Sequence, residues 1–163
     1  MENDALWKGI IEDLLEDFIA FFITDIYPQI DFSKGYEFLD KELQDLTPES
    51  FQAKKAVDKL VKVYLKNGIE KWILIHIEVQ GYEESNFAKR MFIYFYRLFD
   101  KYDKEIVSLV IFTDKNKNYK PDKFVYSLSQ TKLSYEYGVH KLIDYDEPEL
   151  EKSDNPFALI VLS

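Results

Sequence analysis

The stretch "KWILIHIEVQGY", residues 71–82, decides the fold that the sequence predicts. Apolar side chains fill both faces of an extended strand through most of its length, which is typical of a central strand in a sheet. Glu78 and Gln80 interrupt the apolar pattern at its end. An ionised carboxylate is costly to bury without a partner. We therefore expect another part of the chain to compensate for Glu78.

A β-hairpin brings a second strand beside this one. Residues 56–66, "AVDKLVKVYLK", alternate between apolar and polar side chains, as a strand does. Asn67-Gly68 follows them, and this dipeptide is a strong turn signal before the arm formed by residues 71–80. The two arms should therefore pair in an antiparallel manner.

The register of this hairpin decides which residue lies opposite Glu78. A hairpin centred on Gly68 pairs Asp58 with Glu78, whereas a strict two-residue turn would pair Asp58 with Ile77 on the other face. The first register is favoured because it places the valines of the earlier arm on the same face as the isoleucines of the later arm. It leaves Lys59 as the one charged residue on that apolar face.

Two facing carboxylates at a strand end suggest a site for a divalent cation. Side chains alternate along a strand, so His76, Glu78 and Gln80 share one face with Asp58, and the roots of the two acids lie about 5 Å apart. Their repulsion is relieved by Mg²⁺ or Mn²⁺, ions that bind one or two carboxylates, keep several waters and engage phosphates. Gln80 could orient a metal-bound water. The alternative is a strand end where both acids face water, with His76 as a structural residue.

The remaining elements follow from apolar spacing and from capping residues. Residues 35–46 are ambiguous between a short strand and a helical turn. Asn155 is a candidate N-cap, with Pro156 at the first position of a short final helix. The other predicted elements are helices over residues 4–25 and 86–104, a buried strand over 105–114, and short strands within 123–145.

Composition limits the class of protein. The chain has 163 residues, 47% of them hydrophobic and 17% aromatic, which predicts one globular domain over residues 1–163. It has no cysteine, no signal-peptide pattern and no apolar stretch as long as a membrane span, so we expect a soluble, cytoplasmic protein with no membrane partner. The formal net charge of −9 weighs against a broad nucleic-acid surface, although a small metal-assisted site remains compatible with it.

Six blocks of the sequence together resemble a known family. The order of helix, strands, Asp…Glu-x-Gln and helix is similar to the PD-(D/E)XK nuclease superfamily. More narrowly, the chain resembles the Rpn family of recombination-promoting nucleases, also described as YhgA-like transposases. The blocks run in order over essentially the whole chain: "DALWKGIIEDLLEDFIAFF", "FLDKEL", "VDKLVKVYL", "WILIHIEVQG", "RMFIYFYRLFDKYDKEIVSLVIFTD" and "NPFALIVLS".

The resemblance implies a fold and roles for particular residues. It implies an α/β, restriction-endonuclease-like mixed sheet flanked by helices. Asp58 and Glu78 match the metal-binding acids of the superfamily. Gln80 stands where most of the superfamily has lysine, and the Rpn-like group resembles this chain in having glutamine there. Arg90 and Tyr94 have the spacing of the Gln-x-x-x-Tyr element of RecB-like nucleases, with arginine in place of glutamine, so both are candidate substrate contacts and Arg90 could contact a scissile phosphate; the alternative for Arg90 is an exposed helix arginine.

A further ligand, a substrate and a partner are also implied. An acid on the first helix often completes such sites, and of Glu12 and Glu16 we prefer Glu12; the alternative is that both are solvated. The resemblance implies Mg²⁺ or Mn²⁺ as cofactor, DNA as substrate and, by analogy, a homodimer. Family members tend to be longer, so we expect this chain to be the N-terminal part of a larger protein. The competing interpretation is a nuclease fold retained for protein interaction without catalysis.

Overall fold

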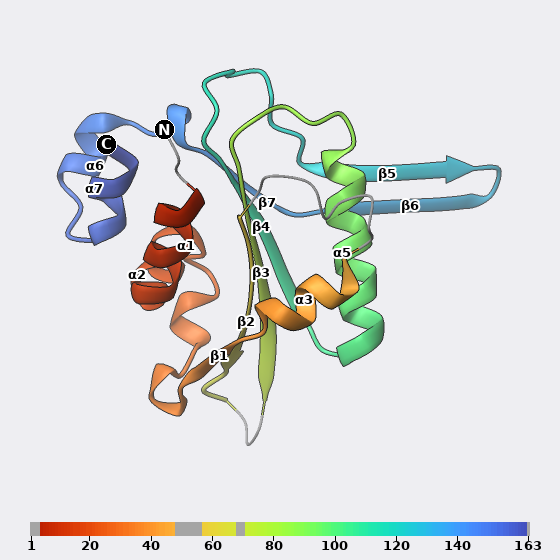
Figure 1. Ribbon diagram of the computed structural model, residues 1–163, viewed down its shortest axis with the longest axis horizontal. Helices are drawn as coiled ribbons and strands as arrows, with labels where there is room; N and C mark the ends of the chain where they lie inside the picture. The colour runs from red at the N-terminus through yellow and green to blue at the C-terminus, as the bar shows by residue number, and fades with distance from the viewer. Residues whose placement is uncertain (1–3, 48–56, 68–70, 163) are drawn as a thin grey trace.

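A mixed five-stranded sheet forms the centre of the computed structural model, which describes residues 4–47, 57–67 and 71–162 (Figure 1). The strand order is β1-β2-β3-β4-β7, and helices cover both faces. The predicted α/β class with a mixed, helix-flanked sheet is confirmed. The strands are β1 (Tyr36–Phe38), β2 (Val57–Tyr64), β3 (Trp72–Gln80), β4 (Ile106–Phe112) and β7 (Gly138–Lys141).

Strand β3 lies in the middle of the sheet, as its apolar sequence predicted. It pairs with β2 in an antiparallel manner and with β4 in parallel. The β2–β3 register places Asp58 opposite Glu78 and Leu60 opposite His76, so the predicted register is confirmed. The predicted turn at Gly68 lies outside the described residues.

Helices α1 (Asp4–Asp13), α2 (Leu15–Phe22) and α7 (Pro156–Leu162) cover one face of the sheet (Figure 1). The prediction of one helix over residues 4–25 was wrong, because the chain leaves helical geometry at Leu14. Hydrogen bonds continue across this break, so it is a kink that lets both short helices follow the sheet. The core on this face contains Trp7, Ile11, Leu15, Phe18, Ile19, Phe22, Val61, Val63, Ile73, Ile75, Ile77, Val79, Leu109, Ile111 and Phe157.

Helix α5 (Phe87–Tyr102) covers the opposite face, together with α3 (Asp40–Leu46). The predicted helix over residues 86–104 is confirmed, and the ambiguous residues 35–46 form both β1 and α3. The buried stripe of α5 has helical spacing and is formed by Phe87, Arg90, Met91, Tyr94 and Leu98. Arg90 is therefore a buried member of an otherwise apolar and aromatic stripe.

A two-stranded arm extends past α5. Strands β5 (Lys123–Leu128) and β6 (Thr131–Glu136) pair only with each other in the described chain, and Figure 1 shows them projecting from the body. A two-residue turn joins them, with Ser129 at a φ of 55°. The prediction of short strands within residues 123–145 is confirmed by β5, β6 and β7.

The end of the described chain is tied to the first helices. Asn155 Oδ1 accepts a hydrogen bond from the Phe157 N–H at 2.8 Å, which confirms the predicted N-cap of α7. Its Nδ2 donates to the Asp17 carbonyl at 2.9 Å. The remaining short elements are the 3-10 turns Tyr27–Gln29, Phe32–Lys34 and Leu142–Asp144, and helix α6 (Glu147–Glu151). Within the described ranges, every helix is too short or too polar to cross a membrane.

Candidate functional site

The candidate site is a polar cluster on the α5 face of the sheet, at the end of β3. The hairpin register sets Asp58 and Glu78 side by side, and strand alternation adds His76 and Gln80 to the same face. His76, Glu78 and Gln80 are fully buried, while Asp58 is partly exposed. The sequence prediction that these four residues share one face is therefore met by the backbone register.

Arg90 of α5 reaches into this cluster and is 1% exposed. Its Nη1 donates to Glu78 Oε1 at 2.9 Å, and its Nη2 donates to Gln80 Oε1 at 3.2 Å. Its Nε donates to Glu84 Oε2 at 3.0 Å. Arg90 is thus neither an exposed helix arginine nor a free cation, because three side chains already accept its hydrogen bonds.

Glu84 is the member of the cluster that the sequence did not predict. It precedes α5, and both of its backbone polar groups pair with the Tyr119 hydroxyl: the Glu84 N–H donates to that oxygen, and the hydroxyl donates to the Glu84 carbonyl. Strand or helix periodicity gives no signal for a loop residue. The sequence of α5 did contain a signal, because an arginine within a buried apolar stripe needs a carboxylate partner. That requirement points to an acid near Arg90 without specifying which one.

The two facing acids differ in their electrostatic surroundings. Burial, and after it the charge of Glu78, raises the pKa of Asp58 to about 6. Burial alone would lower the pKa of Arg90, but Glu78 and Glu84 reverse this and raise it. Glu78 Oε2 is buried and has no hydrogen-bond partner among the described residues. One oxygen of Glu78 is therefore neutralised by Arg90 and the other is not.

His76 and Tyr94 close the buried end of the cluster. The ring centroids lie 5.0 Å apart in an edge-to-face arrangement. His76 Nε2 lies 3.6 Å from Glu78 Oε1, and in the described chain neither ring nitrogen makes a hydrogen bond. Burial, followed by the charge of Glu78, raises the pKa of Tyr94 to about 12. The Tyr94 phenol therefore stays protonated and uncharged beside the two acids.

Glu12 is not brought together with Asp58 and Glu78. Its Oε1 lies 2.6 Å from Lys59 Nζ, and Asp40 Oδ2 lies 2.5 Å from the same nitrogen. Lys59 neighbours Asp58 in β2 and therefore points to the opposite face of the sheet. Its side chain is fully buried, so the two acids neutralise the charge that the sequence left on the apolar face. Here Glu12 is an ion-pair partner on the α1 face.

The donor set can be compared with the needs of a divalent cation. The described residues contain no group of three or more His, Cys, Asp or Glu side chains arranged to hold a metal ion. Mg²⁺, however, commonly takes only one or two protein carboxylates and fills its other positions with water and phosphate. Asp58 and the unpartnered Oε2 of Glu78 supply two such oxygens. These residues therefore fit a cation that takes two protein oxygens and completes its coordination with water or phosphate.

Comparison with models of known protein families, with curated proteins and with solved structures found no match for this chain.

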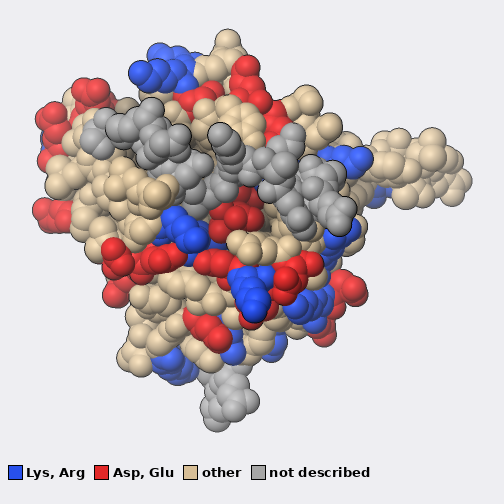
Figure 2. Space-filling view, in the orientation of Figure 1, with Lys and Arg blue, Asp and Glu red and all other residues tan. Residues whose placement is uncertain are grey.

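The charges on the surface bear on which substrates the protein could bind. Figure 2 shows acidic and basic side chains interspersed on the face that it presents, and its coloured residues form no continuous basic surface there. This face therefore offers the phosphate groups of a substrate local contacts with single basic residues and no extended basic surface.

Proposed function

We propose that this protein is a metal-dependent nuclease that hydrolyses phosphodiester bonds in DNA, with a restriction-endonuclease-like domain of the Rpn type. The observation that carries the proposal is the direct cross-strand pairing of Asp58 with Glu78, whose Oε2 is buried without a hydrogen bond in the described chain. The resemblance of the sequence blocks to Rpn nucleases supports the same assignment. The role in recombination or transposition rests on that resemblance alone.

Asp58 and Glu78 would hold Mg²⁺ or Mn²⁺ at the edge of the cluster. A bound cation supplies a nucleophilic water near neutral pH and neutralises charge on the scissile phosphate. Gln80 replaces the usual lysine, and its amide can orient a water through hydrogen bonds but cannot donate positive charge. Arg90 already contacts Gln80 and Glu78, so among the described residues it is a nearby side chain that can supply that charge.

Arg90 and Tyr94 remain the candidate substrate contacts. For Arg90 to bind a phosphate oxygen, it must release at least one of its present acceptors. Glu84 holds the Nε side of the guanidinium, so Arg90 can keep this bond while Nη1 and Nη2 exchange partners. Tyr94 would contribute through packing beside His76, because its raised pKa keeps the phenol protonated.

Plasmid nicking tests the proposal. The variants Asp58→Asn and Glu78→Gln keep the shapes of the side chains and remove their charge. We expect each to lower Mg²⁺-dependent nicking of supercoiled DNA by a factor on the order of 100. The matched control is Glu37→Gln, an exposed acid on β1 of the same sheet, which should cleave like wild type. Undiminished cleavage by both site variants would refute the assignment.

The second candidate function is a non-enzymatic interaction module. The observation that favours it is the ion pair between Arg90 and Glu78, which already neutralises one carboxylate without any metal. A structural cluster of this kind predicts that neither Mg²⁺ nor Mn²⁺ binds, and that the wild-type protein has no cleavage activity that Asp58→Asn could abolish.

A further inference from the structure

The β5–β6 arm has an apolar face that begins in the core and continues outward. Its register places Phe124 opposite Tyr135, Tyr126 opposite Leu133 and Leu128 opposite Thr131, and directly opposed residues share a face. Phe124 and Tyr135 pack against α5 within the body. Tyr126 and Leu133 lie farther out and are 46% and 37% exposed, and Leu128 near the tip is 67% exposed.

The outward face of α5 continues this apolar surface. Tyr96 is 43% exposed and Phe99 is 51% exposed. Phe92 stacks on Phe124 of the arm with ring centroids 5.1 Å apart, and Phe95 lies 5.7 Å from Phe99 by the same measure. Arm and helix therefore form one corner-shaped apolar surface.

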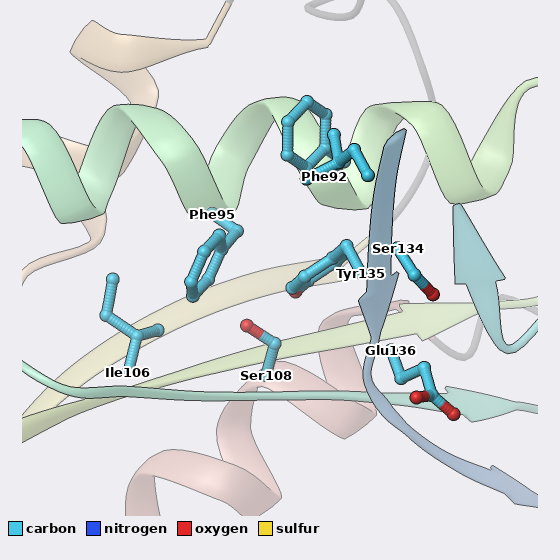
Figure 3. Close-up of a pocket in the computed structure, with 8 residues that line it drawn as sticks. Phe92, Phe95, Ile106, Ser108, Ser134, Tyr135 and Glu136 are labelled. Atoms are coloured by element: carbon cyan, nitrogen blue, oxygen red, sulfur yellow. The ribbon is translucent and has the colours of Figure 1, made fainter. Parts of the chain in front are cut away.

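A hollow of about 430 Å³ lies in this corner, between α5, β4 and β6. Figure 3 shows Phe95, Ser108 and Tyr135 pointing into the space between these three elements. Leu133 of the arm also lines it. The hollow is thus large enough for an aliphatic or aromatic side chain, and it opens beside the arm that carries such side chains.

We infer that two copies of this chain associate by exchanging arms, each arm lying against α5 of the other copy with Leu128 directed to its hollow. A protruding apolar arm occurs on the same chain as a hollow whose walls are apolar at Phe92, Phe95, Ile106 and Leu133 and polar at Ser108, Ser134 and Glu136. A two-fold contact therefore covers both features on both copies at once, as a self-complementary interface does.

The exposed area is adequate for such a contact. The five exposed side chains Tyr96, Phe99, Tyr126, Leu128 and Leu133 present on the order of 500 Å² per chain, given typical side-chain areas. Two chains would bury about 1,000 Å² from these residues alone, which is where specific interfaces begin. Isolated apolar residues need no explanation, whereas a patch of this size equals the largest on a typical monomer, and such patches often have a function.

Charge also favours the arm as the point of contact between two copies. The chain carries a net charge of −9, so two copies repel one another. Residues 123–136 hold two lysines and one glutamate, and the outer part of the arm in Figure 2 shows no charged side chain in that view. Residues 100–105 at the end of α5 hold three acids and two lysines. A slightly basic arm therefore meets a slightly acidic helix end.

Sedimentation velocity over about 1–200 µM protein tests the inference, and it does not depend on nuclease activity. Wild type should form a dimer, and Leu128→Lys should raise the dimer dissociation constant at least tenfold. The matched control is Leu159→Lys on α7, which is 68% exposed and should leave the dimer unchanged. A wild type that stays monomeric at the highest concentration overturns the proposal, and so does a Leu128→Lys variant that dimerises normally.

The absence of cysteine permits a direct test of the arm exchange. The single-cysteine variants Leu128→Cys and Phe99→Cys are mixed and oxidised, and a disulfide-linked heterodimer should form in excess over a mixture of Leu159→Cys with Phe99→Cys. Equal yields in both mixtures would overturn the exchange, as would links between two Leu128→Cys chains alone. Loss of DNA binding in Leu128→Lys without a change in mass would assign the arm to nucleic acid and reject the inference.

Discussion

Asp58 and Glu78 occupy facing positions, but the fold treats their charges differently. Glu78 has Arg90 within 2.9 Å, whereas Asp58 makes no ion pair in the described chain. Burial and the neighbouring Glu78 consequently raise the pKa of Asp58 to about 6. The folded protein therefore disfavours the ionised form of Asp58, and a bound cation would offset this.

The pH dependence of stability should report this carboxyl group. Its pKa is about 6 in the folded state and about 3.9 in an unfolded chain, so between these values the folded state binds more protons. The free energy of unfolding therefore falls as pH rises from about 4 to about 6. Asp58→Asn stays neutral, so above pH 6 it should gain up to about 3 kcal/mol of stability relative to wild type, compared with their difference at pH 4. Urea unfolding in EDTA at pH 4 to 7 measures this.

The difference between the two proteins is the quantity to follow, because other groups titrate in the same range. Glu37→Gln, an exposed acid on β1 of the same sheet, is measured at the same pH values as the matched control. An Asp58→Asn variant with the same offset at pH 4 as at pH 7 would show that Asp58 has an ordinary pKa.

At the level of residues, strand alternation was sufficient to predict the site face but not its ion pairs. Asp58, Glu78 and Gln80 follow from a two-residue period and one register, both of which can be read from the order of valines and isoleucines. The pairing of Arg90 with Glu84 depends on how a loop returns to the start of α5, which no local pattern specifies. Glu12 lies where it does because it pairs with Lys59. The sequence showed Lys59 as a lone charge on an apolar face, which indicates that it needs an acidic partner.

Helices and strands with a clear hydrophobic periodicity or a capping residue could be predicted from the sequence. Features that depend on tertiary packing could not. The β2–β3 hairpin, α5 and the capped α7 have local signals in the sequence. The kink at Leu14 has none, because the apolar residues before and after it continue the helical period. The turn of the arm contains Ser129 and Gln130 without glycine or asparagine, so the usual hairpin signal is missing.

The cap of α7 can be tested through Asn155. Asn155→Ala removes the bond to the Phe157 N–H and the bond to the Asp17 carbonyl, so α7 should separate more readily from α2. We expect a loss of about 1–2 kcal/mol in the free energy of unfolding. Asp154→Ala, an exposed change one residue earlier, should cost less than about 0.5 kcal/mol. Equal costs for the two variants in urea unfolding would show that the Asn155 bonds do not hold the helix.

On the scale of the molecule, the sheet separates two kinds of interior. The α1 face is closed by aliphatic and aromatic residues, with Lys59 neutralised at its edge. The α5 face combines two smaller apolar clusters with the polar group around Glu78. The face whose apolar residues are divided into two smaller clusters thus holds the candidate site, and the arm extends from the same side (Figure 1).

A metal ion that binds the folded protein must stabilise it as a whole, whether or not it supports catalysis. A site with a dissociation constant of about 1 mM would add about 1.4 kcal/mol in 10 mM Mg²⁺. Wild type should therefore show a higher Tm in MgCl₂ or MnCl₂, and the Asp58→Asn, Glu78→Gln double variant should not. Because the chain carries −9, any salt also screens its repulsion, so NaCl of equal ionic strength is the reference. If Mg²⁺, Mn²⁺ and NaCl raise the Tm of wild type equally, the cluster binds no cation, and the interaction module becomes the better assignment.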